Sequence, residues 1–400
     1  MMLTALQILL IIVMGLLILT SLGSFLKLER FGIHFFPLGL IFKTEFFNKL
    51  LIRMGDSWKK FWKWVYNIGK ILAGIITVVL IVYFLVNPFL ILFNSPAGLG
   101  LQLIIPGVTM EFRVFLLFIL PILFVLVPHE IAHGVMARRE GIEIKSSGIL
   151  VLLVLFGAFV ELSKESLEKA DLRKRIKVFM NGSAVNAFFA VFFLILYLLT
   201  PFITSIGYKS PDGVLVTKVY DDYPAIYSGI SRGDIIQHIG IYNTTELAIV
   251  YSEVNNVKDY SIILANYINA TLLYLKLLNG TIVPLTPTRM DPNTNTNSTN
   301  KIFLGVNIFN YRPPKASWQS IWFPYYWDIE ILYTLNLSIM AVFLNMLPLW
   351  ISDGDKILRD YLKIRGYNEN KSKKILNALR IVSLCILLIN VTLSMIRFRW

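Results

Sequence analysis

Six long apolar runs are the feature that most constrains how this chain can fold. They cover residues 3–26, 69–94, 112–137, 176–206, 328–350 and 374–396. Each is near the roughly 20 residues that a helix needs to cross the hydrocarbon core of a bilayer. Apolar residues make up 56% of the 400 residues and charged residues 16%, whereas soluble domains have about 45–50% and about 25%. We therefore expect a polytopic α-helical membrane protein with about six spans, not a soluble enzyme. Its expected surroundings are the lipid bilayer.

Basic residues predict how these spans are oriented. Lys and Arg are concentrated in three alternate loops, which are 27–70, 138–177 and 356–374. Loops rich in Lys and Arg stay on the cytoplasmic side, so both termini and loop 95–111 are expected outside. Arg397 and Arg399 in the tail do not fit this rule. Because membrane topology accounts for the net charge of +13, we expect no nucleic-acid partner.

A seventh apolar stretch, from Gly148 to Val160, is too short to cross a membrane as a helix. It is rich in Val, Leu and Phe and contains glycines at positions 148 and 157. This pattern favours a membrane-embedded hairpin or a re-entrant segment. Other helices would have to shield it, because backbone groups in lipid need hydrogen-bond partners.

Residues 207–320 are polar and interrupt the series of spans. Val214 and Val216 alternate with their neighbours as in a strand, and the Asn- and Thr-rich stretch 290–300 predicts a loop. We expect an α/β domain inserted on the outer side. It contains four N-x-Ser/Thr tripeptides, which are either glycosylation acceptors of an external domain or accidental in a Thr-rich stretch; they begin at Asn243, Asn269, Asn279 and Asn297.

The third run ends in an HExxH pattern formed by His129, Glu130 and His133. Residues four apart share one face of a helix, so two imidazoles can bind one zinc ion there. Glu130 can take a proton from a water at such a site. The chain has only four histidines, so an HExxH pattern is not expected to arise by chance. Its one cysteine, Cys385, excludes a cysteine-based metal site. Polar side chains in an apolar helix are also costly, which indicates a functional site.

A catalytic zinc site needs a third protein ligand and an open position. His34 lies in an amphipathic cytoplasmic segment and His238 in the polar domain, so we interpret both as ordinary histidines. A carboxylate is then expected. Asp353 follows the fifth run just beyond Pro348 and lies near the cytoplasmic end of the membrane, as the two histidines do. Asp355, two residues further, is the rival ligand.

These motifs resemble those of the site-2 proteases, which are zinc metalloproteases that cut peptide bonds within the membrane. The family pairs HExxH with N-x-x-P-x-x-x-x-D-G in a later span, which here is formed by Asn345, Pro348, Asp353 and Gly354. Two further segments, GAFVE at 157–161 and NGSAVN at 181–186, are similar to segments of the archaeal branch. In the second of these, Ser183 replaces the usual proline and Asn186 matches the family's asparagine.

The resemblance implies a role for each residue. His129, His133 and Asp353 would hold one zinc ion, and Glu130 would activate water and then protonate the leaving amine. Asn345 would hold the substrate backbone or stabilise the oxyanion, and Asn186 would support it. The alternative for either asparagine is a hydrogen bond between helices.

The inserted domain resembles a PDZ module, in its GVLVTKV strand and in the Gly233-Asp234 pair followed by two isoleucines. PDZ modules bind peptide ends by adding a strand to a sheet edge. Two interpretations remain open. The domain either admits only substrates whose outer part is already trimmed, or is a rigid cap that shields the site.

The sequence therefore predicts an intramembrane zinc endopeptidase that acts on single-span membrane proteins, with its active site near the cytoplasmic side. A scaffold or receptor of the same fold would have lost a ligand or the base, and neither is lost here. A metal transporter should show internal repeats, and we see none. The expected parts are an N-terminal region with two spans, a catalytic core, an extracytoplasmic PDZ-like domain and a C-terminal region with the third ligand, at 1–110, 111–206, 207–320 and 321–400.

Overall fold

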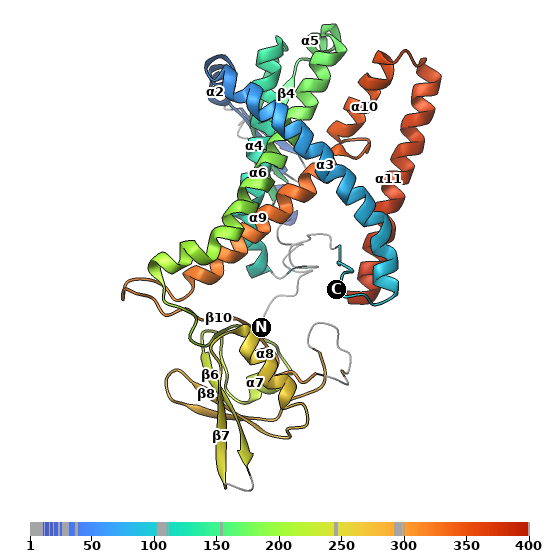
Figure 1. Ribbon diagram of the computed structural model, residues 1–400. Coiled ribbons are helices and arrows are strands. Elements are labelled where there is room, and N and C mark those ends of the chain that lie inside the picture. The colour runs from blue at the N-terminus through green and yellow to red at the C-terminus, as the bar shows by residue number, and fades with distance from the viewer. Residues whose placement is uncertain are drawn as a thin grey trace. The chain divides into compact units, whose positions relative to one another are not determined.

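The computed structural model describes most of the chain (Figure 1). The described residues are 32–36, 39–101, 110, 112–152, 155–243, 247–291, 298 and 301–398, with scattered positions between 11 and 25. The chain divides into two compact units, one formed by residues 1–197 and 330–398 and the other by residues 198–329.

Five of the described helices are long and apolar enough to cross a membrane. They are α3 (Lys59–Leu92), α4 (Phe112–Glu140), α6 (Leu172–Gly207), α9 (Phe323–Met346) and α11 (Glu369–Phe398). They coincide with five of the six apolar runs, as expected. The first run, 3–26, lies largely outside the described residues, so a sixth span stays a prediction. Two short helices, α2 (Glu45–Ser57) and α5 (Lys164–Lys169), complete the first part of this unit.

A four-stranded antiparallel sheet belongs to the same unit. Its order is β1 (Ile33–Phe36), β2 (Gly39–Lys43), β3 (Ile144–Leu152) and β4 (Leu155–Leu162). The apolar stretch 148–160 thus lies in a β-hairpin formed by β3 and β4. We did not predict the hairpin of β1 and β2, which pairs with β3 and contains His34. Strand β4 is an edge of this sheet and packs along α4.

The chain breaks between α9 and α10 (Asp353–Ile364). Pro348 lacks a backbone N–H and restricts the residue before it, so a helix usually ends here. Ser352 then starts α10: its hydroxyl accepts from the Asp355 N–H and donates to the Leu347 carbonyl. Because of this break, Asp353 is the first residue of a new helix, α10. Without the break it would lie in the loop that follows the fifth apolar run.

Close contacts between helices fix the rest of this unit. Gly69 of α3 lies so near the Ala184 carbonyl of α6 that a side chain would collide with it. At the other end of α3, the buried Asn87 and Asn390 side chains hydrogen bond at 2.8 Å and join α3 to α11. Buried amide pairs of this kind join helices where the apolar surroundings offer no water.

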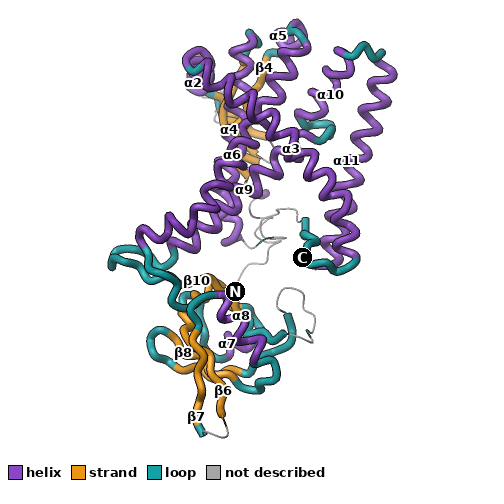
Figure 2. The backbone as a smooth tube through the Cα atoms, viewed as in Figure 1, coloured by secondary structure: helices purple, strands orange, loops and turns teal. Residues whose placement is uncertain are grey.

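The second unit contains a six-stranded antiparallel sheet with two short helices beside it, α7 (Pro224–Tyr227) and α8 (Val257–Asn266) (Figure 2). The strands are β5 (Val214–Val219), β6 (Ile235–Asn243), β7 (Ala248–Glu253), β8 (Leu273–Leu277), β9 (Ile282–Leu285) and β10 (Val306–Asn310). Their order is β10-β5-β6-β8-β9, and β7 also pairs with β6. Buried aliphatic side chains such as Val214, Ile236 and Leu275 form the core. The expected strand at 214–217 is present. Most of the expected loop 290–300, with Asn297, lies outside the described residues.

Candidate active site

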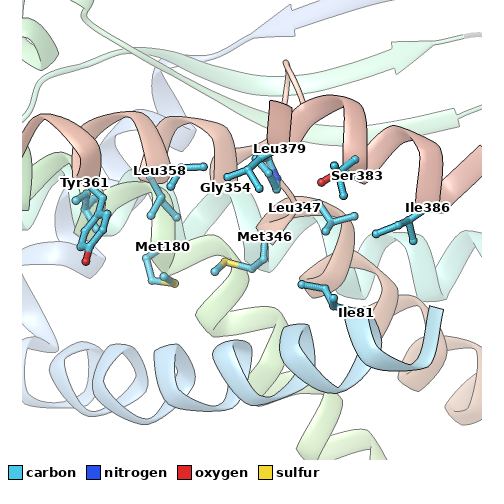
Figure 3. Close-up of a pocket in the computed structure, with 14 residues that line it drawn as sticks. Ile81, Met180, Met346, Leu347, Gly354, Leu358, Tyr361, Leu379, Ser383 and Ile386 are labelled. Carbon is cyan, nitrogen blue, oxygen red and sulfur yellow. The ribbon is translucent and has the colours of Figure 1, made fainter. Parts of the chain in front are cut away.

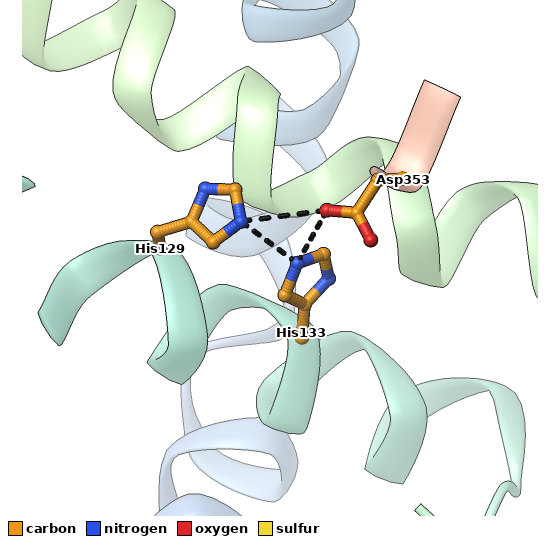
Figure 4. Close-up of side chains that lie close together, drawn as sticks. All are labelled: His129, His133 and Asp353. Atoms are coloured by element: carbon orange, nitrogen blue, oxygen red, sulfur yellow. Dashed lines mark hydrogen bonds and ion pairs between the residues drawn. The ribbon is translucent and has the colours of Figure 1, made fainter. Parts of the chain in front are cut away.

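Three side chains from two helices converge in the first unit (Figure 4). His129 and His133 come from α4, and Asp353 comes from the start of α10. The two Nε2 atoms are 3.1 Å apart, and Asp353 Oδ2 lies 3.4 Å from His129 Nε2 and 2.9 Å from His133 Nε2. All three residues are buried. Among the described residues they form the one cluster with the donor atoms of a metal site.

The hydrogen bond of His133 leaves one ring nitrogen free for a metal. His133 Nδ1 lies 2.8 Å from the Val178 carbonyl of α6. A carbonyl only accepts, so Nδ1 carries the proton and Nε2 keeps its lone pair. Partners of this kind orient metal-binding histidines.

The amide of Asn186 faces the other ligand histidine. Asn186 Nδ2 lies 3.0 Å from His129 Nδ1, and Asn186 Oδ1 is buried without a hydrogen-bond partner among the described residues. A metal on His129 Nε2 would require a proton on Nδ1, and an amide nitrogen cannot accept a hydrogen bond from it. Zinc binding would therefore need the amide turned by 180°, which only exchanges its O and N atoms, and these are nearly indistinguishable by shape. The unpartnered atom of Asn186 would then be an N–H donor.

Gly182 of α6 leaves room for a bound ion. A Cβ at this position would lie 2.5 Å from His133 Nε2 and 2.7 Å from His129 Nε2. Real Cβ contacts are essentially never that short. Residue 182 must therefore be glycine for the histidine nitrogens to stay where they are, and the space that it leaves lies beside both of them.

The donor set fits zinc. Tetrahedral ligands at about 2.0–2.1 Å from zinc are about 3.3 Å from one another, and the three donor atoms are separated by 2.9–3.4 Å. Two imidazoles and one carboxylate are a ligand set of catalytic zinc sites, in which the fourth position stays open. The space beside Gly182 is consistent with this requirement.

The comparison with protein families agrees with this geometry. The sequence profile of Peptidase family M50 matches residues 117–389. This range is more than half of the chain and includes His129, His133 and Asp353. The chain belongs to peptidase family M50. This membership confirms the resemblance to the site-2 protease family that the sequence motifs indicated. A protein of Methanocaldococcus jannaschii named only as uncharacterized is 36% identical over 122 residues, which are 30% of this chain and 30% of that protein.

In this M50 peptidase, Glu130 lies on the side of α4 that faces the sheet. Its Oε2 accepts a hydrogen bond from the Val160 N–H of β4 at 3.1 Å. Glu161, the next residue of β4, accepts instead from Lys145 and Ser146, both at 2.7 Å. These hydrogen bonds lower the pKa of Glu161 to about 2, so it stays charged. Among the described residues Glu130 forms no ion pair, whereas Glu161 pairs with Lys145 and Lys43.

Asp355, the rival ligand, belongs to a different cluster. Its buried carboxylate accepts from Arg380 at 2.7 and 2.8 Å and from Arg359 at 2.7 Å. Burial raises the pKa of Asp355, but the hydrogen bonds from Arg380 and Arg359 outweigh it and lower the pKa overall. This carboxylate joins α10 to α11 and is not part of the converging group.

No hydrogen bond or ion pair between described residues joins the other residues singled out from the sequence to the metal cluster. Asn345 is partly buried near the end of α9, and its side chain makes no hydrogen bond with the described residues. His34 lies in β1, paired with Ile41 of β2. His238 lies in β6 of the second unit beside the Tyr251 ring, as expected for an ordinary histidine.

Sequence reasoning missed two residues at the site. Gly182 has no side chain to attract notice, although it lies inside the NGSAVN segment. In the sequence Lys356 is only one of several basic residues of a loop, but in the structure its Nζ lies 3.0 Å from Asp353 Oδ1. Its position three residues after Asp353 on a helix was the signal that was available, because such residues are neighbours on one face.

An apolar cavity of about 610 Å³ lies on another face of α10 (Figure 3). Met180 of α6 and Met346 of α9 point into it, and α10 contributes Gly354, Leu358 and Tyr361. None of the three metal-site residues lines this cavity. The cavity is therefore separate from the cluster of His129, His133 and Asp353, although Gly354 of the same helix lines it.

Proposed function

We propose that this chain is a zinc endopeptidase that hydrolyses peptide bonds in or near the membrane-spanning segments of single-span membrane proteins. The observation that carries the proposal is the convergence of two histidine nitrogens and one carboxylate oxygen. Glu130 follows His129 directly and forms no ion pair with any described residue. Family M50 membership supports peptide hydrolysis, and five long apolar helices support a membrane substrate.

His129, His133 and Asp353 would hold the zinc ion. Zinc bound there supplies a Lewis acid and lowers the pKa of water. Glu130 is the proton acceptor for the attacking water and then the proton donor to the leaving amine. The Val160 N–H donates a hydrogen bond to Glu130 Oε2 and so holds the carboxylate in one orientation.

Two asparagines are proposed to bind the peptide. With the amide of Asn186 turned as zinc requires, its free N–H is a buried donor next to His129. A donor of this kind stabilises a developing oxyanion. The side-chain amide of Asn345 makes no hydrogen bond with the described residues, so it is free to bind a substrate backbone.

Strand β4 is the proposed place for an extended substrate. It is an edge strand of its sheet and packs against α4, the helix that contains Glu130. Edge strands accept a further strand through free backbone groups. A helical substrate has its carbonyls already hydrogen-bonded, so it would have to unwind before it could pair with β4.

The second unit is proposed to be the extracytoplasmic, PDZ-like part of the chain, acting as a substrate filter or a shield. Its own sheet and core support an independent module. The active site would lie towards the cytoplasmic side, as the basic loops indicate. The proposed parts remain 1–110, 111–206, 207–320 and 321–400.

Glu130→Gln tests the proposal. The variant keeps the shape of the side chain and removes the base, so cleavage of a single-span substrate in proteoliposomes should fall at least about 100-fold. Zinc content should stay at the wild-type value. The control is Glu165→Gln, the same substitution at an exposed position. This variant should cleave the substrate at the wild-type rate. Wild-type cleavage by Glu130→Gln, or a wild-type protein without zinc, would contradict the proposal.

A further inference from the structure

The two oxygens of Asp353 face different partners. Oδ2 faces the Nε2 atoms of His129 and His133 at 3.4 and 2.9 Å. Oδ1 accepts a hydrogen bond from Lys356 Nζ at 3.0 Å, and no other described residue donates to it. The carboxylate therefore offers one oxygen to the histidines while the ammonium group holds the other.

We infer that Lys356 is a positioning residue that holds Asp353 Oδ1, so that Oδ2 alone is presented to the metal. The inference rests on the proposed zinc site. Nothing in the metal-site motif requires a lysine at this place: it follows from the contact between two residues three apart on α10.

Lys356 is itself held in place. Its ammonium group lies 5.0 Å from the centre of the Phe179 ring on α6, a distance at which cation and ring attract. Phe179 is buried and follows Val178, whose carbonyl orients His133. The same turn of α6 therefore orients one ligand directly and another through Lys356.

The first turn of α10 is also anchored on its other side. Asp355 is bound by Arg380 of α11, and the Ser352 hydroxyl caps the helix. With the backbone at Asp353 fixed by these contacts, the remaining freedom of the ligand is rotation of its carboxylate. That torsion is broad, so a hydrogen bond to one oxygen is an effective way to select an orientation.

Two opposite effects determine what removal of Lys356 does. The ammonium group repels a metal cation, so its loss alone would tighten metal binding. It also orders a ligand and satisfies a buried carboxylate oxygen, whose desolvation is otherwise costly. Outer hydrogen bonds of this kind typically change metal affinity or activity 10- to 100-fold, and we expect the ordering effect to dominate.

The test compares Lys356→Met, Lys356→Arg and, as a control, Lys374→Met at an exposed position of α11. All carry Glu130→Gln, so that no cleavage occurs during the measurements. Zinc affinity is measured by competition with a chelator, and ligand geometry by the visible spectrum of the cobalt-substituted protein. Lys356→Met should weaken zinc binding about 10- to 100-fold and alter the cobalt spectrum. Lys356→Arg should restore both, and Lys374→Met should change neither.

Each outcome decides one question. Unchanged or tighter zinc binding by Lys356→Met, with an unchanged cobalt spectrum, would overturn the role of Lys356 while leaving the proposed peptidase intact. Weaker binding that Lys356→Arg fails to restore would also overturn it, because a general packing defect would then be the cause. Absence of metal binding in the Glu130→Gln parent would instead overturn the proposed zinc site itself.

Discussion

Replacing Gly182 with alanine should remove metal binding by adding a single methyl group. The added Cβ would lie 2.5 Å from His133 Nε2, 2.7 Å from His129 Nε2 and 2.6 Å from His129 Cε1. Non-bonded heavy atoms pack best at about 3.5–4.0 Å. The ring nitrogens would therefore have to retreat by about 1 Å to relieve the contact.

A displacement of this size is large for a metal site. A 1 Å misplacement at an active site can cost about 100-fold, and here two of the three proposed ligands are affected at once. We expect zinc affinity to fall at least about 100-fold, which corresponds to about 2.7 kcal/mol. Peptide cleavage should fall by at least the same factor.

The fold should survive the substitution. Gly182 lies inside α6, where alanine is favoured over glycine by about 0.5–1 kcal/mol. Gly74→Ala is the matched control, because Gly74 also lies in an apolar helix and an added Cβ would meet nothing within 4 Å. Zinc is measured by metal analysis after dialysis against a chelator, and folding by thermal unfolding. A Gly182→Ala protein with wild-type zinc affinity would refute the packing of α6 against the two histidines.

Further predictions concern the third ligand and the inserted domain. Asp353→Ala should lose zinc. Asp355→Asn should instead lower the free energy of unfolding by about 3 kcal/mol. This value is the lower end of the range for a broken buried ion pair, because Arg359 is half-exposed. Loss of zinc from Asp355→Asn at an unchanged unfolding temperature would instead make Asp355 the ligand. Replacing residues 210–312 by a short linker should leave the membrane unit folded, since the Lys209 N–H donates to the Pro313 carbonyl at 2.9 Å and the ends already meet. The set of substrates that is cut should change, and unaltered selection in a proteomic comparison would leave the domain only a shielding role.

Local sequence patterns predicted those parts of the molecule that depend on local periodicity. Five apolar runs are helices because about 20 apolar residues can satisfy their backbone within one helix in lipid. The hairpin within 148–160 and the strand at Val214 follow from short apolar and alternating segments. The hairpin of β1 and β2 was not predicted, because its stability depends on pairing with β3, more than 100 residues further along the chain.

The sequence by itself determined that His129 and His133 share a face of one helix, since their spacing of four matches the helical repeat. The sequence favoured Asp353 over Asp355 from its position near the end of the fifth apolar run and from its motif. Helix periodicity does not make this choice, because two carboxylates two residues apart point to different sides of a helix. Which one faces the histidines depends on the position of α10, which the Pro348 break, the Ser352 cap and the contact of Asp355 with Arg380 determine. The roles of Gly182 and Lys356 were likewise decided only by the tertiary structure, because they arise from distances between segments that the order of residues does not specify.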